Sequence, residues 1–261
     1  MLGAIAGDIA GSAYEWDKVG DRQFQLFPAA AAFTDDSVLT IAVADAILRS
    51  SDGVAPDYRG FIHNYGRRWT GRGYGGMFRG WLASSDPEPY NSFGNGSAMR
   101  VSPVAWAYDD EKTVLEQASR SADVTHNHPE GIKGAQSVAL AIFLARNGES
   151  KEAIRSRIEH EFEYDLQRSV EQIQPVYSFD VTCQGSVPES IIAFLDSTDF
   201  EGAVRNAIWL GGDADTQACI AGSIAEAFYR GVPSVIGSEV RKRLDTELLS
   251  VVDEFKARFD K

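Results

Sequence analysis

Gly3-Ala4-Ile5-Ala6-Gly7-Asp8-Ile9-Ala10-Gly11 places a glycine at every fourth position of a largely apolar segment that runs on to Tyr14. Residues four apart share one face of a helix, so we expect a helix over residues 4–14 with one face that carries almost no side chains. Another backbone can approach such a face closely. In a membrane segment the same spacing would indicate helix dimerisation, but this stretch is too short to span a bilayer and contains Asp8.

Helical patterns also dominate the rest of the chain. Apolar residues at helical spacing, or signals for helix ends, predict further helices. These cover residues 36–49, 111–124, 134–146, 150–163, 216–230 and 238–259, and a helix that ends near Leu210 follows a capping box at Thr198. Residues 176–183 show a modest strand pattern, and we do not expect a sheet. Without a repeat, a linker or a break in composition, one all-α domain over residues 1–261 is the simplest account.

The composition argues against several classes of protein. The 261 residues carry a formal net charge of −13, which disfavours electrostatic binding to nucleic acid or to an anionic membrane. Two cysteines do not make a disulfide framework. The first residues lack the basic region of a signal peptide, and no apolar run approaches the ~20 residues needed to span a bilayer. These features predict a cytoplasmic protein.

Two short acidic clusters carry most of the functional information. Thr34-Asp35-Asp36 and Asp213-Ala214-Asp215-Thr216 each place two carboxylates and a threonine hydroxyl at the start of a predicted helix. One such pair alone is ordinarily explained by the helix dipole. The same chemistry occurs twice here, and hard oxygen ligands packed this closely suit Mg²⁺ or Mn²⁺. If the fold joins the clusters, their carboxylates share one cleft and stay ionised only among cations.

Residues 70–100 form the longest irregular region, and irregular segments of this length are uncommon in compact domains unless they bind something. Within it, the turn at Ser92–Arg100 either offers backbone N–H groups to a phosphate or is an ordinary tight turn with a buried Phe93. His126 or His128 either hydrogen-bonds a ligand or caps a helix end. Glu15, taken alone, is a surface acid. Four histidines and two distant cysteines make a poor zinc site.

Taken in order, these motifs resemble the ADP-ribosylglycohydrolase family, which includes the dinitrogenase reductase-activating glycohydrolases and the vertebrate ADP-ribosylhydrolases, and they are similar to its bacterial branch. The resemblance covers nearly the whole chain. It rests on Gly7-Asp8 through Glu15, Thr34-Asp35-Asp36-Ser37, Gly94-Asn95-Gly96-Ser97-Ala98-Met99-Arg100, Thr125-His126 and Gly211-Gly212-Asp213-Ala214-Asp215-Thr216. It implies a compact orthogonal helical bundle and a metal-dependent hydrolase that cleaves the glycosidic bond between ADP-ribose and an acceptor.

The resemblance also implies roles for individual residues. Two Mg²⁺ ions, or Mn²⁺, would be held by Thr34, Asp35, Asp36, Asp213, Asp215 and Thr216. The catalytic residues would be Glu15, Asp35 and Asp36, with Glu15 as a gate or acid–base group and Asp36 as the alternative base. ADP-ribose would contact Tyr90, Ser92, Phe93, Gly94, Asn95, Gly96 and His126. The turn would hold its pyrophosphate, Tyr90 or Phe93 would stack on adenine, and His126 would border the ribose.

Other functions use the same residues differently. A non-catalytic binder of ADP-ribose or a related nucleotide would use the same cleft, and a crystallin-like structural role is a further alternative. A nucleotide-sugar transferase with an Asp-x-Asp motif would need an α/β sheet. The expected partner is ADP-ribose or an ADP-ribosylated substrate, and the motifs leave the acceptor and the oligomeric state open.

Overall fold

Helices account for nearly all of the regular structure. The computed structural model describes residues 1–51 and 54–259, and its helices are α1 (Leu2–Gly11), α2 (Asp35–Arg49), α3 (Tyr58–Arg68), α4 (Gly76–Ala83), α5 (Gly96–Met99), α6 (Ser102–Ala107), α7 (Glu111–Asp123), α8 (Pro129–Arg146), α9 (Lys151–Phe162), α10 (Val170–Ile173), α11 (Cys183–Leu195), α12 (Phe200–Leu210), α13 (Ala214–Phe228), α14 (Ser234–Arg243) and α15 (Thr246–Phe259). Within the described ranges, Gly94 and Thr182 form an isolated antiparallel bridge and there is no sheet. The all-α prediction is confirmed. No helix in the described part of the chain is both long and apolar enough to cross a bilayer.

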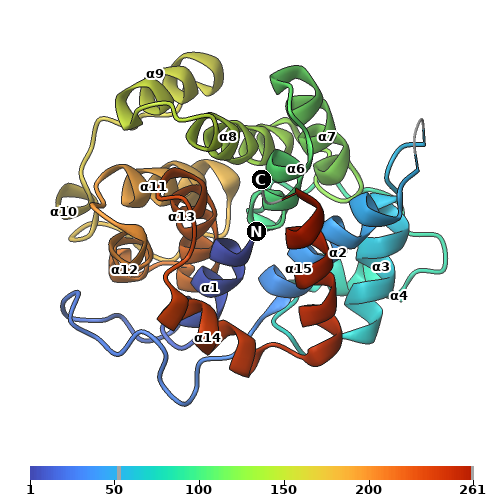
Figure 1. The fold of residues 1–261 in the computed structure, drawn as a ribbon, viewed down its shortest axis with the longest axis horizontal. Coiled ribbons are helices and arrows are strands. Elements are labelled where there is room, and N and C mark those ends of the chain that lie inside the picture. Colours follow the sequence, from blue (N-terminus) through green and yellow to red (C-terminus); the bar gives the residue numbers. More distant parts are fainter. Residues whose placement is uncertain (52–53, 260–261) are drawn as a thin grey trace.

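α1 and α13 pack backbone against backbone, and Figure 1 shows the two helices side by side near the middle of the molecule. A Cβ atom added to Gly3, Gly7 or Gly11 would lie less than 3.0 Å from backbone atoms of α13. The residues that face these glycines are, in the same order, Gly222, Ala218 and Ala214, so the two helices run antiparallel. Their backbones are therefore in direct contact, and the end of α1 reaches the start of α13.

The start of α2 lies against the same helix. Asp8 of α1 is fully buried and accepts hydrogen bonds from Thr34, the N-cap residue of α2, and from Ser37 in its first turn. α1 therefore gathers the N-termini of α2 and α13 at one place. Helix N-termini carry a partial positive charge and unpaired N–H groups, so acidic groups are favoured there.

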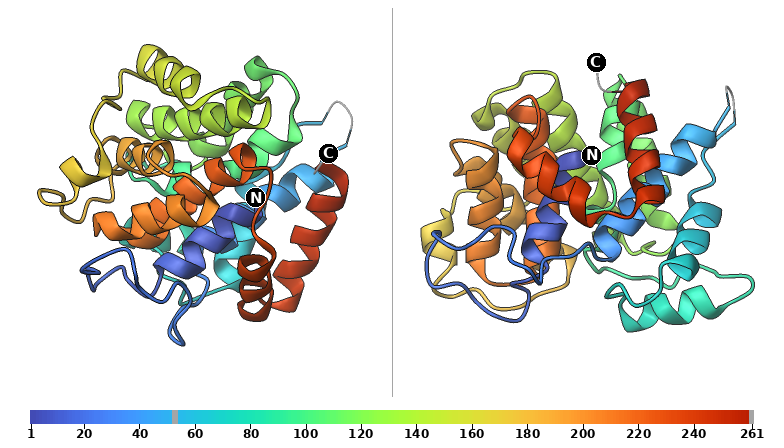
Figure 2. Two further views of the ribbon diagram at one scale, coloured as in Figure 1. Left: turned by 60° about the vertical axis from the view of Figure 1, so that its left-hand side comes forward. Right: turned by 60° about the horizontal axis from the view of Figure 1, so that its bottom comes forward.

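The other helices surround this assembly, as the two further views in Figure 2 show. α8, α11 and α12 pack against α13, whereas α3, α6 and α15 pack against α2. α7 and α9 cover the outer side of α8. α2 and α13 are thus each enclosed by other helices.

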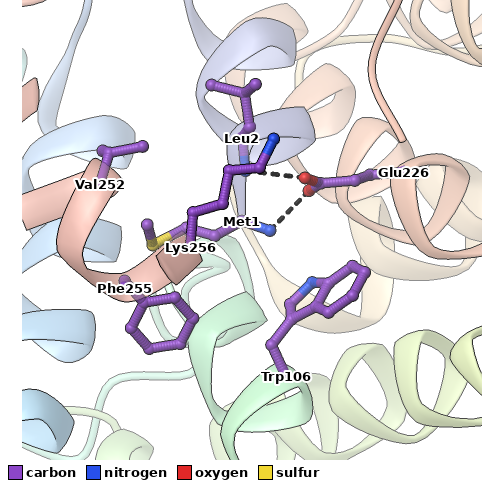
Figure 3. Close-up of a pocket in the computed structure, with 7 residues that line it drawn as sticks. All are labelled: Met1, Leu2, Trp106, Glu226, Val252, Phe255 and Lys256. Atoms are coloured by element: carbon purple, nitrogen blue, oxygen red, sulfur yellow. Dashed lines mark hydrogen bonds and ion pairs between the residues drawn. The ribbon is translucent and has the colours of Figure 1, made fainter. Parts of the chain in front are cut away.

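Glu226 closes the other end of the contact between α1 and α13. Its carboxylate pairs with the Met1 amine at 2.5 Å and accepts a hydrogen bond from the Leu2 N–H group at 3.2 Å, as Figure 3 shows. It also accepts one from the Gly3 N–H group at 2.8 Å. An acid at a helix N-terminus is stabilised by these N–H groups and by the helix dipole. The cavity beside it, lined by Trp106 and Phe255, measures about 30 Å³, which has room for water but not for a ligand.

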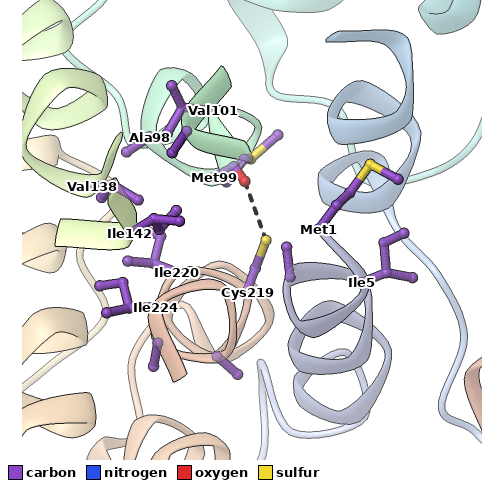
Figure 4. Close-up of a cluster of buried hydrophobic side chains, with 14 of the residues drawn as sticks. Met1, Ile5, Ala98, Met99, Val101, Val138, Ile142, Cys219, Ile220 and Ile224 are labelled. Carbon is purple, nitrogen blue, oxygen red and sulfur yellow. Dashed lines mark hydrogen bonds between the residues drawn. The ribbon is translucent and has the colours of Figure 1, made fainter. Parts of the chain in front are cut away.

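Apolar side chains from three helices fill the space behind the site. Met99 of α5, Val138 and Ile142 of α8, and Ile220 and Ile224 of α13 are buried and lie together, as Figure 4 shows. Fully burying side chains of this size stabilises the fold by roughly 1.5–3 kcal/mol each. This packing fixes the position of α5, and with it the turn at residues 92–96, relative to α13.

Some predicted elements differ from the structure. Residues 238–259 form two helices rather than one, because the backbone is extended at Leu244 between α14 and α15. Asp199, not Thr198, is the N-cap of α12: its side chain accepts a hydrogen bond of 2.7 Å from the Gly202 N–H group. The region at residues 70–100 is not wholly irregular, since it contains α4.

Two sizeable helices, α3 and α11, lie outside the predicted set. α11 contains Pro188 and Gly185, which are unfavourable inside helices and obscure the helical pattern. The strand pattern at residues 176–183 leads only to the single bridge at Thr182. The turn that begins α11 is held instead by Asp180, whose side chain accepts a hydrogen bond from the Thr182 N–H group at 2.7 Å.

The contact between α1 and α13 predicts that one methyl group added at Gly7 destabilises the fold. Gly7→Ala forces the two backbones apart and should lower the free energy of unfolding by about 1–3 kcal/mol, measured by urea denaturation. Gly80 is the matched control, because it is an exposed glycine inside α4 where an added Cβ meets nothing within 4 Å. Gly80→Ala should leave the stability unchanged or raise it by up to ~1 kcal/mol. Equal effects of the two changes would contradict this description of the contact.

Candidate active site

A cleft of about 500 Å³ opens where the N-termini of α2 and α13 meet. One wall comes from Glu15, just after α1, and from the first turns of α2 and α13. The opposite wall comes from the turn at residues 92–96 together with His126, and the segments 73–78 and 179–181 complete the rim. The volume lies within the usual range for a small-molecule site.

The fold brings the two acidic clusters together. Asp36, Asp213 and Asp215 are buried, and Asp35 is partly buried beside them. The Thr216 hydroxyl donates a hydrogen bond of 3.4 Å to Asp36, which links α13 directly to α2. The clusters, some 180 residues apart in the chain, therefore form one site.

Carboxylate oxygens approach one another in two overlapping groups. Oxygens of Asp8, Asp36 and Asp215 lie within 4.8 Å of one another, and so do oxygens of Glu15, Asp213 and Asp215. Asp215 belongs to both groups. Like charges at such separations repel strongly when little water is present to screen them.

The pKa values of these acids reflect their crowding. Burial raises the pKa of Asp36 well above its usual value, and the nearby charge of Asp215 raises it further. The same two causes act, in the same order, on the pKa of Asp35 and of Asp213. Burial, followed by the charge of Asp215, raises the pKa of Glu15 to about 7. Without a compensating positive charge, several of these acids would hold protons near neutral pH.

The chemistry of the site fits divalent cations. Asp36 Oδ1 is buried and has no hydrogen-bond partner in the described ranges, so one acceptor in the middle of the site is unsatisfied. Its neighbours offer carboxylate and hydroxyl oxygens, with no histidine or cysteine in either group of acids. Oxygen-only sets suit Mg²⁺ or Mn²⁺ rather than zinc or copper.

Asp8 is a site residue that was not among the predicted ligands. It is fully buried and accepts hydrogen bonds from the Thr34 N–H group (3.0 Å), the Thr34 hydroxyl (2.6 Å), the Ser37 N–H group (3.1 Å) and the Ser37 hydroxyl. It thereby fixes the first turn of α2 and directs Asp36 toward Asp215. The signal in the sequence was an acid in the middle of an apolar helix, whose partners lie about 26 to 29 residues away.

The turn at residues 92–96 forms the wall opposite the acids. It is anchored by a hydrogen bond from the Asn95 N–H group to the Val181 carbonyl (2.8 Å) and by another from the Cys183 N–H group to the Phe93 carbonyl (2.9 Å). The Asn95 side chain also donates to Asp213 at 2.7 Å. The predicted phosphate-binding turn and the predicted metal site are thus joined by one hydrogen bond.

The predicted aromatic residues lie in different places. Tyr90 lines the cleft, and its ring centroid lies 6.0 Å from that of His126, which also lines it. Phe93 is not among the lining residues: its ring is 44% exposed and packs edge-on against His128 at 5.3 Å. Phe93 is therefore neither buried, as the ordinary-turn reading required, nor turned into the cleft. Phe179, which the sequence did not single out, lines the rim and stacks on Trp16.

Comparison with known proteins agrees with this arrangement. A family model described as ADP-ribosylglycohydrolase matches residues 1–261. The chain is 28% identical over 306 residues to "ADP-ribosylhydrolase ARH3" of Homo sapiens, with 88% of this chain and 84% of that protein covered. It is 29% identical over 273 residues to "ADP-ribosylarginine hydrolase Tri1" of Pseudomonas putida (strain GB-1), with 88% and 69% covered.

A solved structure has the same fold. The chain named "ADP-ribosylglycohydrolase-related protein complex" aligns with a TM-score of 0.73 at 23% sequence identity, and the alignment covers 98% of this chain and 96% of that one. The resemblance drawn from the sequence motifs is confirmed. The chain belongs to the ADP-ribosylglycohydrolase family.

Proposed function

We propose that this protein hydrolyses the glycosidic bond between ADP-ribose and an acceptor and releases ADP-ribose, with the help of two divalent cations, Mg²⁺ or Mn²⁺. The observation that carries the proposal is the meeting of both acidic clusters beside the turn at residues 92–96 in one cleft. Family membership and the names of the two relatives support the reaction class. The absence of a sheet from the described residues speaks against a nucleotide-sugar transferase.

The ligands of the cations would be Thr34, Asp35, Asp36, Asp213, Asp215 and Thr216. When bound, the cations would neutralise the crowded acids and supply Lewis-acid chemistry. Asp8 acts behind this set, because its oxygens are occupied by the start of α2. Asn95 likewise supports one of these ligands, because its side chain donates a hydrogen bond to Asp213.

ADP-ribose would extend from the acids to the turn. The N–H groups of Gly94 and Asn95 already donate to Ser92 Oγ and to the Val181 carbonyl, so the other N–H groups of the turn would hold the pyrophosphate. Tyr90, one of the aromatic residues that line the cleft, would stack on adenine. The sugar that carries the acceptor would then lie at the acidic end. Breaking its glycosidic bond builds positive charge on the anomeric carbon, which the nearby carboxylates stabilise.

Glu15 is the best candidate for proton transfer. Water adds to the anomeric carbon and loses a proton. The acceptor leaves with the electrons of the glycosidic bond and takes up a proton. Glu15 lines the cleft and lies outside the proposed set of metal ligands. Burial, the larger of the two causes, raises its pKa to about 7 in the metal-free protein, which suits it to exchange a proton near neutral pH. The name of the Pseudomonas relative makes ADP-ribosylated arginine the first acceptor to test.

The variant Asp215→Ala tests whether this protein is a metal-dependent hydrolase. It removes the acid that belongs to both groups, so Mg²⁺ affinity, measured by calorimetry, and ADP-ribose release from an ADP-ribosylated arginine peptide should both fall by about 100-fold or more. Asp123→Ala is the control, because Asp123 is an exposed acid at the end of α7. A wild-type protein that binds ADP-ribose but releases none from a panel of acceptors would favour the non-catalytic binder instead.

The raised pKa values predict how stability depends on pH. Burial raises the pKa of Asp8 to about 7, so the folded state binds this proton more tightly than the unfolded state does. In EDTA, the free energy of unfolding should therefore fall as pH rises from ~4 to ~7, by on the order of 4 kcal/mol from Asp8 alone. Saturating Mg²⁺ should remove most of this fall. Urea denaturation curves in EDTA that do not change over this pH range would contradict the crowding of acids described above.

A further inference from the structure

Arg100 is a buried cation without an anionic partner. It follows α5, its side chain is fully buried, and no described carboxylate forms an ion pair with it. Nη2 donates to the Ser121 carbonyl (2.9 Å) and to the Thr125 hydroxyl (2.7 Å), whereas Nε and Nη1 have no partner in the described ranges. Burial lowers the pKa of Arg100 to about 10, so the group stays charged at neutral pH. A buried charge in neutral surroundings is costly and therefore calls for an explanation.

Arg100 itself borders the cleft, and its hydrogen bonds lead to a second lining residue, His126. Thr125 Oγ1, which accepts from Arg100, lies 2.7 Å from His126 Nδ1. A threonine hydroxyl has one proton, and its oxygen already accepts the Arg100 N–H group. The arrangement that satisfies all three groups has Arg100 donating to Thr125 and Thr125 donating to Nδ1. The proton of the neutral His126 ring then resides on Nε2.

His126 Nε2 faces the turn that forms the cleft wall. A Cβ atom added to Gly96 would lie 3.2 Å from Nε2, and one added to Gly94 would lie 3.6 Å from it. Glycine at these two positions leaves the nitrogen open to the cleft, which His126 lines. None of the hydrogen bonds among the described side chains uses Nε2.

The surroundings keep the ring neutral. Burial lowers the pKa of His126 well below its usual value, and the charge of Arg100 lowers it further. Tyr90, whose ring centroid lies 6.0 Å away, is another titratable neighbour of the ring. An imidazole in this position donates a hydrogen bond without itself becoming charged.

We propose that Arg100 and Thr125 are positioning residues that fix His126 as a neutral Nε2–H donor to an oxygen of the ligand bound at the turn. Only the identity of that ligand, ADP-ribose, rests on the proposed function. A cation at the far end of a hydrogen-bonded chain polarises each link, which strengthens donation to an anionic oxygen at the near end. The unpaired charge of Arg100 is then explained, because it acts on a phosphate-bearing ligand rather than on a carboxylate of the protein.

The first test needs no ligand and no activity. In ¹⁵N-labelled wild-type protein, NMR should show His126 with Nε2 protonated and Nδ1 unprotonated between pH 6 and 8. The chain has four histidines, so the loss of one set of signals in His126→Gln assigns them. A ring protonated on Nδ1, or on both nitrogens, would overturn the proposal. Because this readout does not depend on catalysis, it separates the proposal from the assigned reaction.

The second test uses a pair of variants at Thr125. Thr125→Val keeps the shape of the side chain but removes the hydroxyl, and it should weaken ADP-ribose binding about tenfold by calorimetry and shift the Nδ1 resonance. Thr125→Ser keeps the hydroxyl and should restore both. Unchanged affinity in a folded Thr125→Val protein would overturn the proposal. If wild-type protein binds no ADP-ribose, the proposed function fails, while the NMR result still decides the state of His126.

Discussion

The backbones of α1 and α13 touch at three successive glycines of α1 because these glycines face small residues of α13. This contact places the end of α1 at the start of α13, and Asp8 then holds the start of α2 against the same helix. Two helix N-termini and the acids they carry are thereby forced into one place. Side chains of ordinary size at Gly3, Gly7 or Gly11 would separate the helices and disperse the site.

The resulting cleft is electrically asymmetric. One wall gathers acids whose pKa values are raised by burial and by one another. The other contains the turn at residues 92–96 and His126, and the buried Arg100 charge borders the cleft beside them. Such a cleft suits a ligand with an anionic middle and a hydroxyl-rich end, provided that cations lie between that end and the acids. Burying the crowded acids and the unpaired Arg100 charge costs free energy in the free protein. Bound cations would offset the charge of the acids, and an anionic ligand would offset that of Arg100.

Local patterns in the sequence predicted the parts of the site but not all of its connections. The glycine spacing predicted a bare helix face, and the paired acids predicted an oxygen-ligand site. The role of Asp8 depends on hydrogen bonds to Thr34 and Ser37, which no local pattern reveals. The orientation of Phe93 and the presence of Phe179 in the rim depend on how residues 176–183 cross the turn. α11 was hidden by Pro188 and Gly185, whose cost is offset by the burial of the helix.

We propose that the acids of α2 and α13 form one cradle for a pair of divalent cations. Anomalous scattering from crystals soaked in Mn²⁺ would locate these ions. We expect two peaks in the cleft, with oxygens of Asp36 and Asp215 at about 2.2 Å from the ions. A map at saturating Mn²⁺ with no peak near either carboxylate would contradict it.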